Sequence, residues 1–169
     1  MLAVAELIAR MKDGEYADRS RAAEALAEIG PAAAEAIPDM VALLRSFDDD
    51  EDDDAEFIAN FAAWVLSRIG PAAVPRLIQL LMDADAPWKP GRLLADPSRL
   101  SAEGRKALEH VKLEIACFVR RQAAWALGEI GAGARAALNP LRHMLEDPNP
   151  VARASAAEAI EKIGAAAGD

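Results

Sequence analysis

Residues 123–131 read Ala-Ala-Trp-Ala-Leu-Gly-Glu-Ile-Gly, and three close variants of this phrase occur elsewhere in the chain. The variants are AAEALAEIG at 22–30, AAWVLSRIG at 62–70 and AAEAIEKIG at 156–164. Self-similarity at a period of roughly 20–50 residues is the signature of a repeat protein, in which each unit buries its apolar face against its neighbours. The phrase therefore predicts a solenoid before any other feature of the sequence is considered.

Each copy of the phrase predicts one helix and its end. In the third copy Ala123, Ala126, Leu127 and Ile130 fall at the spacing of a single buried helical face. Gly131 follows, and glycine readily adopts the left-handed conformation that ends a helix. We call the helices that carry the phrase first helices.

A second helix is expected after each of these ends, marked by doubled apolar pairs such as Leu77-Ile78 and Leu80-Leu81. The chain is predicted to begin with a second helix and to end with a first helix, giving an all-α superhelix of about four helix pairs. The expected helices span residues 2–12, 16–29, 34–46, 55–69, 72–83, 113–130, 134–146 and 150–163. A further helix begins near Ser98 or Ser101, and the sequence leaves open whether it continues into 113–130 or breaks near Lys112.

The phrase and its surroundings resemble the HEAT-repeat family, specifically the bacterial type named after phycobilisome lyases. The closest match is VRRQAAWALGEIG at residues 119–131, and the resemblance covers nearly all of the chain apart from two insertions. It implies a helical solenoid whose second helices line a concave binding face. It implies no particular partner, because one fold serves many functions.

Members of this family often carry a basic residue early in the first helix. Here that place is taken by Arg19 or Arg21, by Arg120 and by Arg153, whereas the second copy has Ala59. We expect these arginines to pair with acids of neighbouring repeats and to serve the structure.

Composition narrows the class of protein. The 169 residues contain 28 acidic and 19 basic side chains, for a net charge of −9, which argues against nucleic-acid binding by phosphate neutralisation. We expect a single domain over residues 1–169 with a flexible tail at 165–169, no signal peptide, no membrane insertion and a cytoplasmic location.

Cys117 is the only cysteine, and we interpret it as a buried packing residue rather than a reactive thiol.

Two insertions separate the repeats, because the glycines that end the phrases lie 40, 61 and 33 residues apart. The first contains seven consecutive acids, Asp48, Asp49, Asp50, Glu51, Asp52, Asp53 and Asp54. They fit a solvated loop whose last aspartate caps the helix at Ala55, a docking patch for a basic partner, or a loose divalent-cation site. An EF-hand is excluded, since the required glycine and glutamate are missing.

The second insertion, near residues 84–112, is rich in proline and in basic side chains. From Trp88 to Arg121 there are eight Lys and Arg against four Asp and Glu, a local charge of +4. Trp88, with Lys89 and Arg92 beside it, is either an interface anchor or a cover for the solenoid edge. Both insertions occupy the same kind of link, so we expect them on one edge. There the oppositely charged segments either contact each other within one molecule or allow self-association with a second molecule.

The resemblance to HEAT-like repeats makes the second helices the default binding face, and these helices carry the other candidate binding residues. Equivalent positions 42, 79 and 143 should share one face, and the candidates there are Asp39, Arg45, Arg76, Gln79, Arg142 and His143. Trp64 and Trp125 occupy equivalent places in the first helices, and we interpret them as packing between successive first helices.

Catalytic and metal-binding motifs are missing from the sequence. His110 and His143 lie far apart without metal-ligand spacing, and there is no Walker loop, dinucleotide fingerprint or nucleophile motif. We therefore expect no enzyme activity, no cofactor and no metal.

Three functions remain compatible with these features. The first is a non-enzymatic protein–protein interaction scaffold or small assembly subunit. The second is an accessory subunit similar to the phycobilisome lyases, binding a tetrapyrrole or other apolar ligand near Trp88, Leu93, Leu94 and the second-helix face. The third is a scaffold that responds to cations through residues 48–54.

Overall fold

The computed structural model describes residues 3–46, 54–82 and 101–166, with the side chains of 107–109, 111 and 112 outside this description. Throughout these residues the regular structure is helical. The helices are α1 (Val4–Asp13), α2 (Tyr16–Ile29), α3 (Ile37–Arg45), α4 (Ala55–Ile69), α5 (Val74–Met82), α6 (Ala102–Ile130), α7 (Leu138–Met144) and α8 (Pro150–Ala165).

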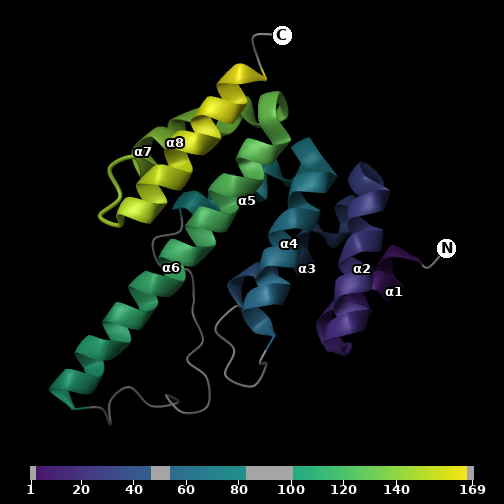
Figure 1. Cartoon of the computed structure of the whole chain (residues 1–169), viewed down its shortest axis with the longest axis horizontal. Helices are drawn as coiled ribbons and strands as arrows, with labels where there is room; N and C mark the ends of the chain where they lie inside the picture. Colours follow the sequence, from purple (N-terminus) through teal and green to yellow (C-terminus); the bar gives the residue numbers. More distant parts are fainter. Residues whose placement is uncertain (1–2, 47–53, 83–100, 167–169) are drawn as a thin grey trace.

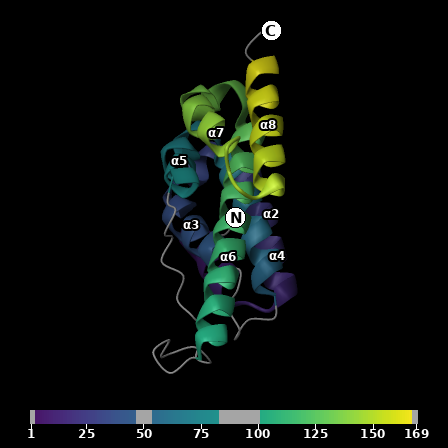
Figure 2. The ribbon, with the colours of Figure 1, turned by 90° about the vertical axis from the view of Figure 1, so that its left-hand side faces the viewer.

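The helices form two layers, as an α-α solenoid requires. The first helices α2, α4, α6 and α8 stand side by side in one layer, and α3, α5 and α7 form the other (Figures 1 and 2). Each second helix contacts the first helix that follows it, in the pairs α1–α2, α3–α4, α5–α6 and α7–α8. The all-α HEAT-like architecture expected from the repeated phrase is confirmed.

Apolar side chains of the repeated phrase make the core between the layers. Leu26, Leu66 and Leu127, which are equivalent in three copies, are all fully buried. The adjacent alanines of the phrase are buried too in those copies, which lets neighbouring helices approach closely. Trp64 and Trp125 are partly buried and pack against this core.

Three of the four glycines end their helices as predicted. Gly30, Gly70 and Gly131 have φ of 60°, 79° and 63° and follow the last residues of α2, α4 and α6. A 3-10 segment then precedes each second helix, over Gly30–Ala36, Gly70–Ala73 and Gly131–Ala137, so these helices begin later than expected. The fourth prediction is wrong, because α8 continues through Gly164 to Ala165, into the expected tail.

Substitution of Gly70 by alanine isolates the cost of this backbone conformation. A Cβ at Gly70 would meet no atom within 4 Å, so packing does not oppose the change. The combination of φ 79° and ψ −140° is nearly restricted to glycine. We expect Gly70→Ala to lower the free energy of unfolding by about 1–3 kcal/mol, measured by urea denaturation. A change below the error of that measurement would contradict the assignment.

The helix beginning in the second insertion runs unbroken into the third phrase. Ser101 caps it, with its hydroxyl accepting a hydrogen bond of 3.1 Å from the backbone N–H of Gly104. The resulting helix α6 has 29 residues and extends well beyond its neighbours (Figure 1). The question that the sequence left open near Lys112 is thereby answered in favour of a continuous helix.

The segment Ala55–Met82 has the length and apolar composition of a membrane span, with a mean hydropathy of 1.3 in its 18-residue window. Of that window, 56% is buried inside the fold. Gly70 divides the segment into α4 and α5, which belong to different layers. Packing in the solenoid core therefore accounts for its apolar composition.

Candidate functional site

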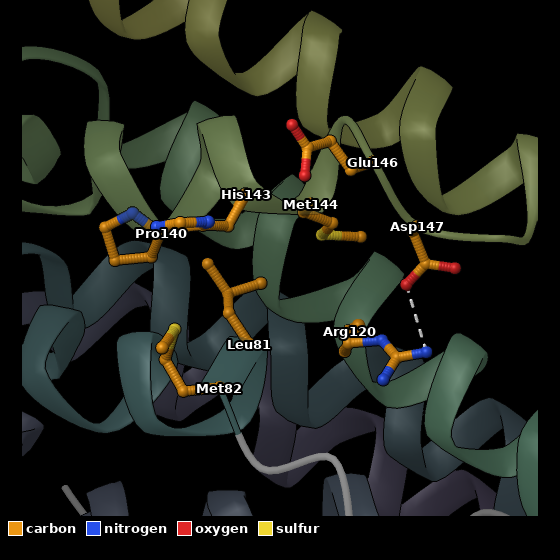
Figure 3. Close-up of a pocket in the computed structure, with 8 residues that line it drawn as sticks. All are labelled: Leu81, Met82, Arg120, Pro140, His143, Met144, Glu146 and Asp147. Carbon is orange, nitrogen blue, oxygen red and sulfur yellow. Dashed lines mark ion pairs between the residues drawn. The ribbon is translucent and has the colours of Figure 1, made fainter.

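A hollow of about 350 Å³ opens between α5, α6, α7 and the link from α7 to α8 (Figure 3). Its apolar walls come from the last residues of α5 and from α7. Its polar lining comes from Arg120 of α6, from His143 of α7 and from the residues that follow α7. The complete lining is Leu81, Met82, Arg120, Pro140, His143, Met144, Glu146 and Asp147.

An ion pair fixes one side of this hollow. Arg120 Nη2 lies 3.1 Å from Asp147 Oδ2, with only 15% and 8% of the two side chains exposed. The other Asp147 oxygen, Oδ1, accepts a hydrogen bond of 2.8 Å from the backbone N–H of Asn149. The pair joins α6 to the link between α7 and α8, so Arg120 does pair with an acid, and that acid lies in the link that follows its own repeat.

The equivalent arginines also hold the chain between helices. Arg19 is buried, and its Nε donates a hydrogen bond of 2.9 Å to the carbonyl of Met11 at the end of α1. Arg153 donates to the carbonyls of Asp147 and Pro148, at 2.7 and 3.0 Å. Arg21 is exposed, and its Nη1 lies 3.6 Å from Asp18 Oδ1 on the same helix. Arg19, not Arg21, is therefore the equivalent of Arg120 in the first copy.

The predicted second-helix residues fall into an exposed and a less exposed group. Arg76 and Gln79 are exposed on α5 and joined by a hydrogen bond of 2.8 Å. Arg142 and His143 are exposed on α7, and His143 lines the hollow.

The remaining two residues, both on α3, are half-buried. Asp39 accepts a hydrogen bond of 3.1 Å from Lys12 Nζ and thereby ties α3 to α1. Arg45 lies in the last turn of α3. Within the part of the chain described, the residues most open to a partner are therefore those of α5 and α7.

The insertion residues proposed as sites lie mostly outside the described residues. This applies to Trp88, Lys89, Arg92, Leu93 and Leu94, and to positions 48–53. Asp54 is described and stands at the N-cap of α4, but its side chain makes no capping hydrogen bond, so the expected cap is wrong. The placement of the two insertions on one edge stays a prediction.

Sequence reasoning missed most of the lining of the hollow. Leu81 and Met144 belong to the doubled apolar pairs and were counted as core, while Glu146 and Asp147 follow the helix without any motif. The sequence did offer one signal for Asp147. It is an acid in the link that follows the repeat of Arg120, and Arg120 was expected to pair with an acid.

Cys117 is buried, as its sequence context predicts, and His110 lies on the surface. Cys117 is buried in α6, with 4% of its surface exposed, and His110 is exposed, 3.9 Å from Glu114 Oε1. Within residues 3–46, 54–82 and 101–166, no group of three or more His, Cys, Asp or Glu is arranged to hold a metal.

Burial raises the pKa of the Cys117 thiol above its ordinary value of 9.0. The thiolate is the reactive form, so we expect iodoacetamide at pH 8 to label Cys117 slowly in the folded protein and rapidly in urea, as followed by mass spectrometry. The folded state binds the thiol proton of Cys117 more tightly than the unfolded state does. The resulting stabilisation of the folded state is complete below pH 9.0 and is lost as the pH rises through the folded-state pKa. Equal labelling rates in buffer and in urea would contradict the buried assignment.

Comparison with family models agrees with the repeat pattern. A model described as PBS lyase HEAT-like repeat matches residues 18–46 and 60–82, and one described as HEAT repeats matches residues 117–168. Together they cover more than half of the chain. No curated protein matches the sequence. HEAT repeats generally mediate protein–protein interaction or scaffolding, and proteins built from them are usually non-catalytic. The repeated phrase, the two helical layers and these matches together show that the chain belongs to the HEAT-repeat family.

Proposed function

We propose that this protein is a non-enzymatic scaffold that binds a protein partner across its second-helix face. The observation that carries the proposal is the hollow beside His143, which opens on the same helices as the exposed Arg76, Gln79 and Arg142. Met82, in the apolar wall of the hollow, is a large side chain with 60% of its surface exposed. An apolar centre with a polar rim is the usual anatomy of a protein interface.

The chemistry of the hollow fits a partner side chain. The apolar wall of the hollow is made by one leucine and two methionines, Leu81, Met82 and Met144. Methionine side chains are flexible and polarisable, so they adapt their shape to different partners. Arg120 and Asp147 neutralise each other, which leaves Glu146 as the negative charge at the rim. An apolar side chain, or one with an apolar stem and a basic head, would be accommodated there.

Photo-crosslinking in the native cell tests this proposal. The photoreactive residue p-benzoylphenylalanine would replace Gln79 or His143 on the proposed face. The control positions are Glu24 and Glu28, which are exposed on α2 in the other layer. We expect one protein to be crosslinked from both 79 and 143 and not from 24 or 28. Adducts formed only from the control positions would overturn the proposed face.

Charge reversal provides the complementary test. The variant Arg76→Glu/Arg142→Glu changes two exposed side chains, so its free energy of unfolding should stay within about 0.5 kcal/mol of wild type per substitution. The crosslink from position 79 should be lost in this variant. A crosslink of unchanged yield would show that neither arginine contributes to the interface.

The second candidate is a tetrapyrrole-binding accessory subunit, favoured by the match to the PBS lyase HEAT-like repeat and by the apolar wall of the hollow. Pockets for drug-sized ligands range over roughly 300–1,000 Å³, and this hollow is at the lower end. A tetrapyrrole would be only partly enclosed there, so the geometry favours the scaffold. Visible absorbance of protein purified from the native cell separates the two, because a bound tetrapyrrole absorbs strongly and a protein partner does not.

A further inference from the structure

A second hollow lies in the other layer, between the first helices α4, α6 and α8. It measures about 340 Å³ and is lined by Asn60, Arg121, Gln122, Trp125 and Ser155. These helices are neighbours in the layer opposite α3, α5 and α7 (Figure 2). The hollow is therefore separate from the face proposed above for the protein partner.

Arg121 gives this hollow its charge. Its neighbour Arg120 is paired with Asp147, whereas Arg121 forms no ion pair or hydrogen bond with any residue in the described part of the chain. Arg121 is half-buried, and no acidic side chain lines the hollow. A partly desolvated guanidinium with open donors favours an anion beside it, since charge-assisted hydrogen bonds are the strong ones.

The other lining groups suit a small polar anion carried on an apolar stem. Gln122 Nε2 donates a hydrogen bond to Asn60 Oδ1, which orients both amides across α4 and α6. Each amide keeps further donor and acceptor capacity after that bond. Trp125, packed on the core, presents a rigid aromatic surface for methylene groups.

The preceding repeat contains a natural control for this arrangement. Trp64 occupies in α4 the place that Trp125 occupies in α6, and both are half-buried. At the places of Arg121 and Gln122, however, α4 carries Asn60 and Phe61. The tryptophan thus recurs without the cation, so a ligand attracted by charge should recognise only the surroundings of Trp125.

We propose that the hollow at Arg121 binds a carboxylate, presented as an Asp or Glu side chain in an acidic segment of a protein partner. Arg121 pairs with the carboxylate, the amides of Asn60 and Gln122 complete its hydrogen bonds, and Trp125 covers the methylene stem. A single cation of this kind matches one carboxylate.

Indole N–H signals in a ¹⁵N-correlated NMR spectrum provide a direct test on the full chain. The three tryptophans give three signals, assigned with Trp64→Phe, Trp88→Phe and Trp125→Phe. The probe is N-acetyl-tetraglutamate amide, and the neutral control is N-acetyl-tetraglutamine amide. We expect the Trp125 signal to shift in a saturable way with the glutamate peptide alone, while the Trp64 signal stays in place.

Arginine variants show whether the shift depends on the proposed cation. Arg121→Gln should weaken binding of the glutamate peptide about tenfold or more, since hydrogen bonds to charged groups contribute about 1.5 kcal/mol or more. Arg121→Lys should retain part of the binding, and Arg68→Gln, which changes an exposed arginine of α4, should retain all of it. Thermal melting of each variant by circular dichroism verifies that it is folded.

The outcomes are decisive in either direction. Equal shifts with the glutamate and glutamine peptides, or unchanged binding by folded Arg121→Gln, would overturn the carboxylate site. Loss of binding in Arg121→Gln together with retention in Arg68→Gln would establish it, and added salt should then weaken the interaction. None of these results depends on the crosslinks expected from the second-helix face.

Discussion

Replacing Asp147 with alanine is expected to lower the free energy of unfolding by about 3–5 kcal/mol. The carboxylate is 8% exposed and lies 3.1 Å from Arg120, whose own side chain is 15% exposed. Its removal leaves a largely buried guanidinium without its counter-charge and the backbone N–H of Asn149 without its acceptor. Urea denaturation followed by circular dichroism measures the change.

A double-mutant cycle separates two contributions to this loss of stability: the loss of the ion pair and the cost of leaving the Arg120 cation without a counter-charge. Adding Arg120→Met to Asp147→Ala should recover much of the stability, because the uncompensated cation is then gone. Glu6→Ala is the matched control, since Glu6 and Arg10 form an ion pair at 3.0 Å with about half of each side chain exposed. This change should cost no more than about 0.5 kcal/mol. Similar costs for Asp147→Ala and Glu6→Ala would show that burial contributes nothing to the Arg120 pair.

Replacing Leu66 with alanine is expected to cost about 2–5 kcal/mol. Leu66 is fully buried in α4, which contacts first helices on both sides and α3 behind it. A central first helix is fixed on all these sides, so the cavity left by the side chain can collapse only in part. Chemical denaturation reports the loss as a lower midpoint with an unchanged slope.

The same position in the last copy of the phrase supplies the comparison. Ile160 is only half-buried in α8, which has a neighbouring first helix on one side in the described residues. Ile160→Ala should therefore cost clearly less than Leu66→Ala. An equal or larger loss at Ile160 would mean that the terminal helix contributes as much to the core as the central one.

The repeated phrase predicted the first helices well because its signals are local. Helical periodicity ends at Gly30, Gly70 and Gly131, and each of these glycines has the positive φ that such an end needs. Gly164 carries the same sequence signal, yet α8 passes through it. Glycine permits a helix end without imposing one.

The candidate sites depended more on contacts between distant residues, and sequence reasoning recovered less of them. The candidates Arg76, Gln79, Arg142 and His143 came from the resemblance to HEAT-like repeats, and all four are exposed. The hollow at Arg121 could not be predicted in this way, because its lining comes from positions 60, 121, 122, 125 and 155. Which of these face one another depends on the stacking of three helices, and no single repeat contains that information.

The length of α6 also has a mechanical consequence. Its C-terminal part, from Ile115 onward, is embedded among α4, α5 and α8, whereas the described side chains from Ala102 to Glu114 are largely exposed. Thirteen helical residues extend about 20 Å, so a tilt of about 10° at the embedded end displaces the tip by about 3 Å. Any tilt of α6 about its embedded end would therefore be amplified at its tip, where a small rotation becomes a displacement comparable to a contact distance.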